Sequence, residues 1–130
     1  MPTVTMVEYE NASGEIRVVY DDIMATRRAD TVTPYWKTIA HHPPTLRQTW
    51  DQFKAAMAAG ALDPLTKEML YLAVSVTNRC DYCIEAHTRA ARGLGMTEPM
   101  LGELMAVIAL ASGANQLAIG YRLEPPKTGS

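Results

Sequence analysis

The chain has 130 residues, of which 48% are apolar and 20% are charged, a balance that is typical of a globular protein and excludes wholesale disorder. A chain of this length can bury roughly two-thirds of its unfolded surface, so it needs no disulfides in order to fold. The formal net charge of -2 removes the main sequence argument for nucleic-acid binding, which is a basic patch of Lys and Arg.

The sequence indicates one cytoplasmic domain over residues 1–130. No uninterrupted apolar stretch reaches the ~18 residues of a membrane span, and the first residues do not resemble a signal peptide. We therefore expect no membrane partner. Residues 1–13 show little periodicity and are predicted to be an extended arm, and residues 124–130 are predicted to be a frayed tail.

The pattern of apolar residues between these ends predicts an all-α fold of about six helices. Proline and capping residues mark several helix starts, of which Asp63-Pro64 is the clearest, and Gly60 is expected to end a helix in the left-handed conformation. The predicted helices cover residues 14–29, 34–42, 45–59, 64–78, 81–92 and 97 to at least 111. The helix over 64–78 is apolar nearly all round, so we expect it to be central.

The two cysteines of the chain, Cys80 and Cys83, are three residues apart at a predicted helix start. Unpaired backbone N–H groups and the helix dipole favour negative charge there, so at least one thiol is expected to have a lowered pKa. The spacing also lets the two residues form a disulfide across the first helical turn. Two cysteines so close together do not make the disulfide framework of a secreted protein.

His87 follows Cys83 by one helical turn and can act on that sulfur as a base or proton carrier. Glu68 lies on the preceding helix, too far from Cys80 along a continuous helix to matter. If the chain reverses near residues 78–81, the two helices run antiparallel and Glu68 and His87 lie at similar heights. A buried carboxylate needs a partner, and His87 supplies one. Ser75 lies on the same stripe as Glu68, where it either joins the site or bonds its own helix backbone.

The order and every interval of Glu68, Ser75, Cys80, Cys83 and His87 resemble the active-site signature of the alkylhydroperoxidase D-like proteins of the carboxymuconolactone decarboxylase superfamily. The resemblance is firmest over residues 62–96 and weaker upstream, around residues 40–43. It implies an AhpD-like helical fold, with an antiparallel helix pair flanking the CxxC motif, that assembles as a homo-oligomer, a trimer or hexamer.

The resemblance also implies residue roles. Cys83 would be the peroxidatic cysteine, Cys80 the resolving cysteine, and Glu68 and His87 the proton relay that activates Cys83. A hydroperoxide would oxidise the pair to a disulfide, and an external dithiol of the thioredoxin or lipoyl type would reduce it, with no metal, flavin or other cofactor.

Ser75 and Tyr82 would support this site. The founding enzyme has His at the position of Tyr82, which places this chain among the smaller peroxidase-like relatives. The decarboxylase branch of the superfamily lacks the cysteine pair, so both cysteines count against decarboxylation here.

Two alternatives keep the same residues but change the function. Cys80, Cys83 and His87 are three zinc-type ligands that Glu68 or water could complete. The chain could also be a non-catalytic, redox-sensing oligomeric domain whose disulfide changes a packing or partner surface. A zinc site should bind roughly one metal ion per chain, whereas a sensor should oxidise without turnover.

Overall fold

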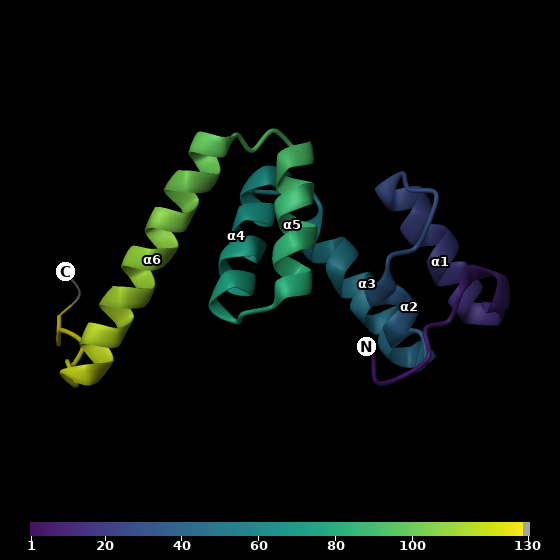
Figure 1. The fold of residues 1–130 in the computed structure, drawn as a ribbon, viewed down its shortest axis with the longest axis horizontal. Helices are drawn as coiled ribbons and strands as arrows, with labels where there is room; N and C mark the ends of the chain where they lie inside the picture. Colours follow the sequence, from purple (N-terminus) through teal and green to yellow (C-terminus); the bar gives the residue numbers. More distant parts are fainter. Residues whose placement is uncertain (129–130) are drawn as a thin grey trace. The chain divides into compact units, whose positions relative to one another are not determined.

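The computed structural model describes residues 1–128, which form six α-helices and one short 3₁₀ helix, with no strand in this range (Figure 1). In chain order the elements are η1 (Tyr9–Asn11), α1 (Gly14–Arg27), α2 (Pro34–Ile39), α3 (Pro43–Met57), α4 (Pro64–Thr77), α5 (Asp81–Gly93) and α6 (Glu98–Gly120). The prediction of an all-α fold is confirmed. Residues 124–128 of the predicted tail are not helical, and residues 129–130 lie outside the described residues.

The chain divides into two compact units, Met1–Ala58 and Ala59–Ser130. The first contains η1 and α1 to α3, and the second contains α4 to α6. Each unit has its own cluster of buried apolar side chains. That residues 1–130 form a single domain stays a prediction.

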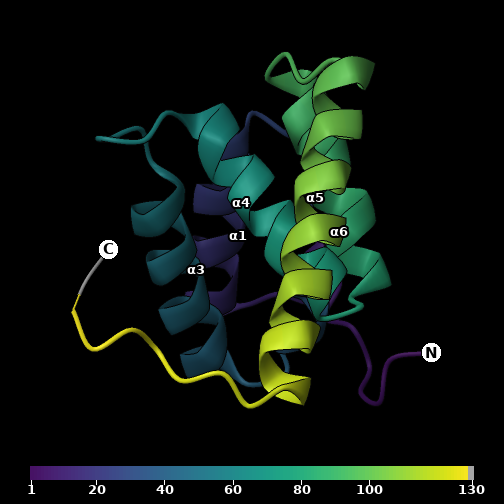
Figure 2. The same ribbon diagram turned by 90° about the vertical axis from the view of Figure 1, so that its left-hand side faces the viewer.

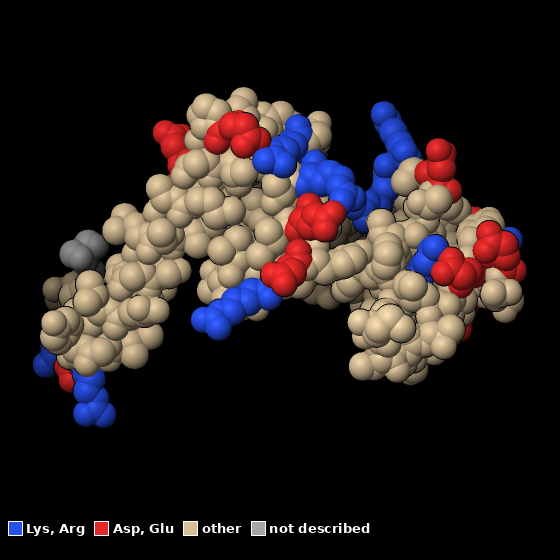
Figure 3. Space-filling model, viewed as in Figure 1, with Lys and Arg blue, Asp and Glu red and all other residues tan. Residues whose placement is uncertain are grey.

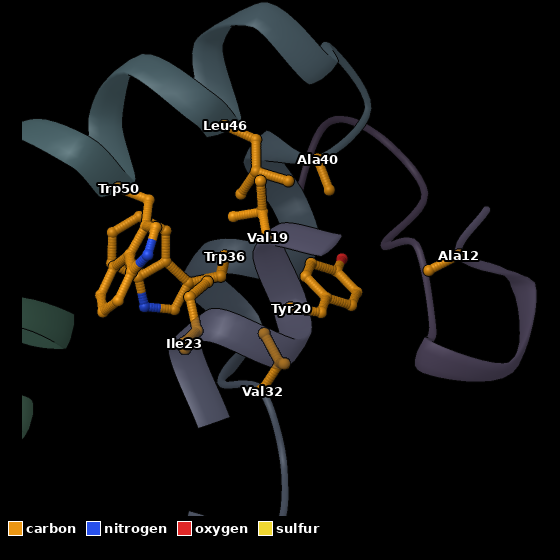
Figure 4. Packing of buried hydrophobic residues seen from close by; sticks show 9 residues of the cluster. All are labelled: Ala12, Val19, Tyr20, Ile23, Val32, Trp36, Ala40, Leu46 and Trp50. Atoms are coloured by element: carbon orange, nitrogen blue, oxygen red, sulfur yellow. The ribbon is translucent and has the colours of Figure 1, made fainter. Parts of the chain in front are cut away.

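The core of the first unit is built around two tryptophans from neighbouring helices. The rings of Trp36 and Trp50 meet edge to face, with their centroids 5.3 Å apart, and both side chains are almost completely buried (Figure 4). The cluster also contains three side chains of α1, those of Val19, Tyr20 and Ile23. Helix α1 lies beside α3 (Figure 2). This edge-to-face arrangement adds to the hydrophobic gain because the positive edge of one ring meets the negative face of the other.

The first residues of the chain are attached to this core. The backbone N–H of Val7 donates to the carbonyl of Lys37 at 2.9 Å, and the Tyr20 hydroxyl donates to the carbonyl of Val7 at 2.7 Å. Ala12 is buried in the cluster. The segment predicted as an extended arm therefore contains η1 and packs on its own unit.

Helix α1 ends at Arg27, two residues before its predicted end, and both ends of the loop between α2 and α3 and the end of α3 also differ from the sequence predictions. The second helix ends at Ile39, and the third begins at Pro43 because His42 is its N-cap, with Nδ1 accepting from the Thr45 N–H at 3.4 Å. The prediction that Gly60 is a left-handed helix cap is wrong. The helix α3 ends earlier, at Met57, and Ala58 turns the chain in an extended conformation with φ -63° and ψ 149°.

The second unit is built on α4 and α5, which lie side by side and run in opposite directions (Figure 1). Leu72 and Ala91 are completely buried between them. Helix α4 contacts both α5 and α6 and is therefore central to its unit, as expected. One of its faces is nevertheless uncovered, since Leu70 and Val74 are 52% and 60% exposed.

Helix α6 extends nine residues beyond residue 111, the minimum predicted from the sequence, and has no buried residue. Its first turns pack against the α4–α5 cluster through Met100, Leu101 and Leu104. Beyond them the helix is apolar and exposed, which Figure 3 shows as a length of uncharged surface. By length and composition alone α6 could cross a membrane.

Acid should destabilise the first unit through Asp22. Its Oδ2 accepts hydrogen bonds from Lys54 Nζ at 2.6 Å and Trp50 Nε1 at 2.7 Å, and these bonds, that from Lys54 first, hold the pKa of Asp22 below the usual 3.8. The stabilisation is therefore present above pH 3.8 and is lost as the pH falls through the lower pKa of the folded state.

We expect Asp22→Asn to make the free energy of unfolding, measured by urea titration at several pH values, fall less steeply below pH 3.8 than in the wild type. An unchanged slope would contradict the assignment to Asp22.

Candidate active site

The site begins with the start of α4, which sets the register of three side chains. Asp63 caps the helix, its Oδ1 accepting from the Thr66 N–H at 2.8 Å, and Pro64 is the first helical residue. From this start, Glu68, Tyr71 and Ser75 follow at intervals of three and four residues, so they lie on one face of the helix. That face meets α5.

The turn between the two helices is a Schellman motif. The Cys80 N–H donates to the Ser75 carbonyl at 3.0 Å, and the Arg79 N–H donates to the Val76 carbonyl at 3.1 Å. Arg79 has a φ of 58°, in the left-handed region that this motif requires and that glycine usually occupies.

Cys80 ends this motif and also begins the next helix. It is the N-cap of α5, and its Sγ accepts from the Cys83 N–H at 3.3 Å. The backbone of Cys80 is therefore fixed from both sides, which places both sulfurs at the N-terminus of α5.

Cys80 and Cys83 are joined by a disulfide, with their Cα atoms 5.3 Å apart, so the structure represents the oxidised protein. The ability of the two cysteines to bond across the first helical turn, inferred from their spacing, is confirmed. In the reduced protein the unpaired N–H groups of this helix end would favour a thiolate.

Glu68 and His87 form a nearly buried pair across the two helices. Glu68 Oε2 lies 2.6 Å from His87 Nδ1, and the two side chains are 12% and 11% exposed. The expected meeting of these residues at similar heights is confirmed. Because a carboxylate can only accept, Nδ1 is the protonated ring nitrogen in this bond, and Nε2 is the nitrogen that can exchange a proton with another group.

Tyr71 is a member of this cluster that sequence reasoning missed. Its ring stacks on the His87 imidazole, with the ring centroids 3.6 Å apart and the planes inclined by 20°. The signal that could have found it is its position between Glu68 and Ser75 on the same helical face.

Ser75 is buried, and its hydroxyl donates to the carbonyl of Tyr71 at 2.8 Å. Of the two alternatives for Ser75, the structure therefore shows the hydrogen bond to its own helix backbone. Ser75 also accepts the Cys80 N–H through its carbonyl. Tyr82 lies in the first turn of α5 and is 44% exposed.

Residues 1–128 contain no group of three or more His, Cys, Asp or Glu side chains arranged to hold a metal ion. The arrangement places an imidazole bonded to a carboxylate on the same helix as a cysteine pair that forms a disulfide.

A comparison with protein families shows to which family this chain belongs. Residues 44–120, more than half of the chain, match the model of the carboxymuconolactone decarboxylase family. The chain belongs to this family. Helix α6 lies within the matched segment, so its apolar character is not evidence of a membrane span.

The likeness to solved structures narrows the class to AhpD-like members. The alkylhydroperoxidase AhpD core from Rhodospirillum rubrum is 42% identical, with a TM-score of 0.94 and coverage of 98% of this chain and 96% of that one. A carboxymuconolactone decarboxylase family protein from Legionella pneumophila, in its apo form, is 24% identical with a TM-score of 0.54, covering 76% and 81% of the two chains. The second likeness shows the fold alone. The prediction of an AhpD-like fold is confirmed, and likeness to such a fold indicates a soluble protein.

Two curated relatives match over shorter segments. An uncharacterised protein in the cox locus of Paracoccus denitrificans is 39% identical over 56 residues, and an uncharacterised protein of Haemophilus influenzae is 45% identical over 49 residues. These segments cover 43% and 37% of this chain, and the chain spans only 50% and 43% of the lengths of the two relatives.

The left-handed residue in the cysteine turn can be tested by a matched pair of variants. Arg79→Gly should leave the free energy of unfolding close to that of the wild type, since relief of the Cβ clash offsets the greater freedom of the unfolded chain. Arg79→Val should be less stable than Arg79→Gly by about 1–2 kcal/mol, because a β-branched residue is least tolerant of positive φ. Urea titration of both oxidised proteins measures the difference, and equal stabilities would show that the turn does not impose this conformation.

Proposed function

We propose that this protein is a thiol-dependent peroxidase that reduces alkyl hydroperoxides in the cytoplasm. The observation that supports it most is the disulfide at the start of α5, with His87, which is paired with Glu68 of α4, one turn beyond Cys83 on the same helix. Membership of a family that includes an AhpD core of the same fold agrees with it.

In the first step the Cys83 thiolate attacks the terminal peroxide oxygen and breaks the O–O bond. The sulfur is oxidised to a sulfenic acid, and the alkoxide leaves as an alcohol after taking a proton. His87, with Nδ1 bonded to Glu68, is the group that takes the thiol proton and returns one to the leaving oxygen.

In the second step the Cys80 thiol attacks the Cys83 sulfenic acid, which forms the disulfide and releases water. An external dithiol of the thioredoxin or lipoyl type then donates two electrons and two protons, becomes a disulfide itself and restores both thiols. No metal or organic cofactor takes part in this cycle. Ser75 supports it by fixing the turn before Cys80, and Tyr82 lies between the two cysteines.

The proposal is tested by stopped-flow reaction of the reduced, metal-free protein with a slight excess of cumene hydroperoxide, with free thiols counted before and after. We expect two thiols per chain to be lost at a rate far above that of free cysteine. Cys83→Ser should abolish the reaction. Cys80→Ser should retain the first step and accumulate a sulfenic acid that dimedone traps.

Thiols that oxidise no faster than free cysteine would refute the peroxidase. Fast oxidation without turnover in the presence of dihydrolipoamide or reduced thioredoxin would instead favour the redox-sensing domain. Loss of the first step in Cys80→Ser, with retention in Cys83→Ser, would reverse the two cysteine roles.

We also propose that the protein works as a homo-oligomer, a trimer or hexamer. The apolar side chains of α6 support this, since Val107, Leu110 and Leu117 are 63%, 74% and 61% exposed in the single chain. Exposed apolar area of this extent usually marks an interaction surface.

Light scattering after gel filtration should give a mass of three or six times 14.3 kDa. Leu110→Glu should shift the protein to a smaller species, because it puts a charge in the apolar face. Arg89→Glu, on the exposed face of α5, is the charge-changing control and should leave the mass unchanged. A wild-type protein of 14.3 kDa would contradict the proposal.

A further inference from the structure

Tyr71 contacts the proton-carrying histidine on a different side from Glu68. Glu68 meets the edge of the His87 ring at Nδ1, whereas Tyr71 covers a face of the same ring. The two contacts come from one helix, α4, and His87 comes from α5. The His87 side chain is only 11% exposed, so the ring is enclosed as well as bonded.

A single hydrogen bond leaves an imidazole ring free to rock about the line that joins its nitrogen to the acceptor. A second aromatic ring stacked on its face removes that freedom, because tilting the imidazole would separate or overlap the two π surfaces. With edge and face both set, the direction of Nε2 on α5 is set too. Stacking also persists when the imidazole is protonated, since an aromatic face attracts a cation.

The same turn of α4 is tied to the cysteine pair. Ser75 donates its hydroxyl proton to the Tyr71 carbonyl at 2.8 Å and accepts the Cys80 N–H through its own carbonyl at 3.0 Å. Two hydrogen bonds through Ser75 therefore connect the backbone of Tyr71 to the backbone of Cys80, the first residue of the CxxC motif.

We propose that Tyr71 is a positioning residue, whose ring holds the His87 imidazole in the orientation that transfers a proton to and from the Cys83 sulfur. The inference rests on the proposed peroxidase function for its consequence, but the ring contact itself is independent of any substrate. The aromatic ring carries the effect, and the phenolic hydroxyl is not needed for it.

The matched variants are Tyr71→Phe, which keeps the ring, and Tyr71→Leu, which keeps an apolar side chain without a ring. We expect Tyr71→Phe to react with cumene hydroperoxide at close to the wild-type rate. Tyr71→Leu should be slower by about 10- to 100-fold, the loss that a small misorientation of a reacting group produces. Equal rates for Tyr71→Leu and the wild type would overturn the proposal. Equally slow rates for Tyr71→Phe and Tyr71→Leu would overturn it too.

A double variant separates positioning from a general structural effect. If Tyr71 acts through His87, Tyr71→Leu should cost much less in a Glu68→Gln background than in the wild type, because the oriented relay is already broken. A purely structural defect would add its full cost in both backgrounds, which would count against the proposal.

NMR of the reduced protein tests the contact without any peroxide. The carbon-bound ring protons of His87 should be shifted upfield by the Tyr71 ring in the wild type and in Tyr71→Phe. Absence of that shift in the wild type would overturn the proposal, even if Tyr71→Leu failed to fold.

Alkylation by iodoacetamide distinguishes the failure of this inference from the failure of the proposed function. Proton removal from Cys83 is needed for this reaction too, so Tyr71→Leu should be alkylated more slowly than Tyr71→Phe at neutral pH. If the wild type ignores peroxide but this order of alkylation rates holds, the peroxidase is refuted and the positioning role stands. If the wild type reduces peroxide and the alkylation rates are equal, the positioning role alone is refuted.

Discussion

The reversal of the chain at residues 78–80 is the constraint on which the site depends. Two backbone hydrogen bonds end α4 there, and the second of them reaches Cys80, which at once becomes the N-cap of α5. The motif requires a left-handed residue, and the sequence supplies Arg79 instead of glycine, at φ 58°. A residue other than glycine in that region has a cost of its own, so the packing of α4 on α5 must outweigh it. Antiparallel packing, the placement of both sulfurs at a helix N-terminus and the meeting of side chains across the pair all follow from this one turn.

Within that frame, the nearly buried Glu68–His87 pair connects stability with chemistry. Removing either partner would leave a polar group without a hydrogen bond in a place where water is largely excluded. Each residue therefore offsets the free-energy cost of burying the other. The same enclosure makes the pair suitable for proton transfer, because a buried hydrogen bond and a stacked ring allow the imidazole few orientations. Tyr71 therefore contributes to packing and orientation together.

The second unit illustrates how a family fold can leave apolar surface on a single chain. Leu72 and Ala91 are buried between α4 and α5. The outer face of α4 and most of α6, however, are not packed against any other part of this unit. An apolar helix without burial gains little from hydrophobic stabilisation, which requires the removal of surface from water. Association of copies through α6, as proposed, would supply the missing burial. It would also explain why a helix with the composition of a membrane span belongs to a soluble family fold.

Local signals in the sequence were sufficient for the helices and for most of the site. Asp63-Pro64 set the start of α4, and the intervals from Glu68 to His87 implied that a hairpin would bring these two residues together, as the structure confirms. The ends of helices were less predictable, since Gly60 looked like a cap, whereas α3 ends at Met57 and is followed by Ala58 in an extended conformation.

The stacking of Tyr71 on His87 was decided only by the tertiary structure, because it depends on how far each helix is rotated about its own axis. Periodicity identifies the face on which a residue lies, but not which ring on the neighbouring helix it will cover. The exposure of α6 has the same origin: apolar composition predicts burial, and only the arrangement of whole helices shows whether another surface is present to provide it.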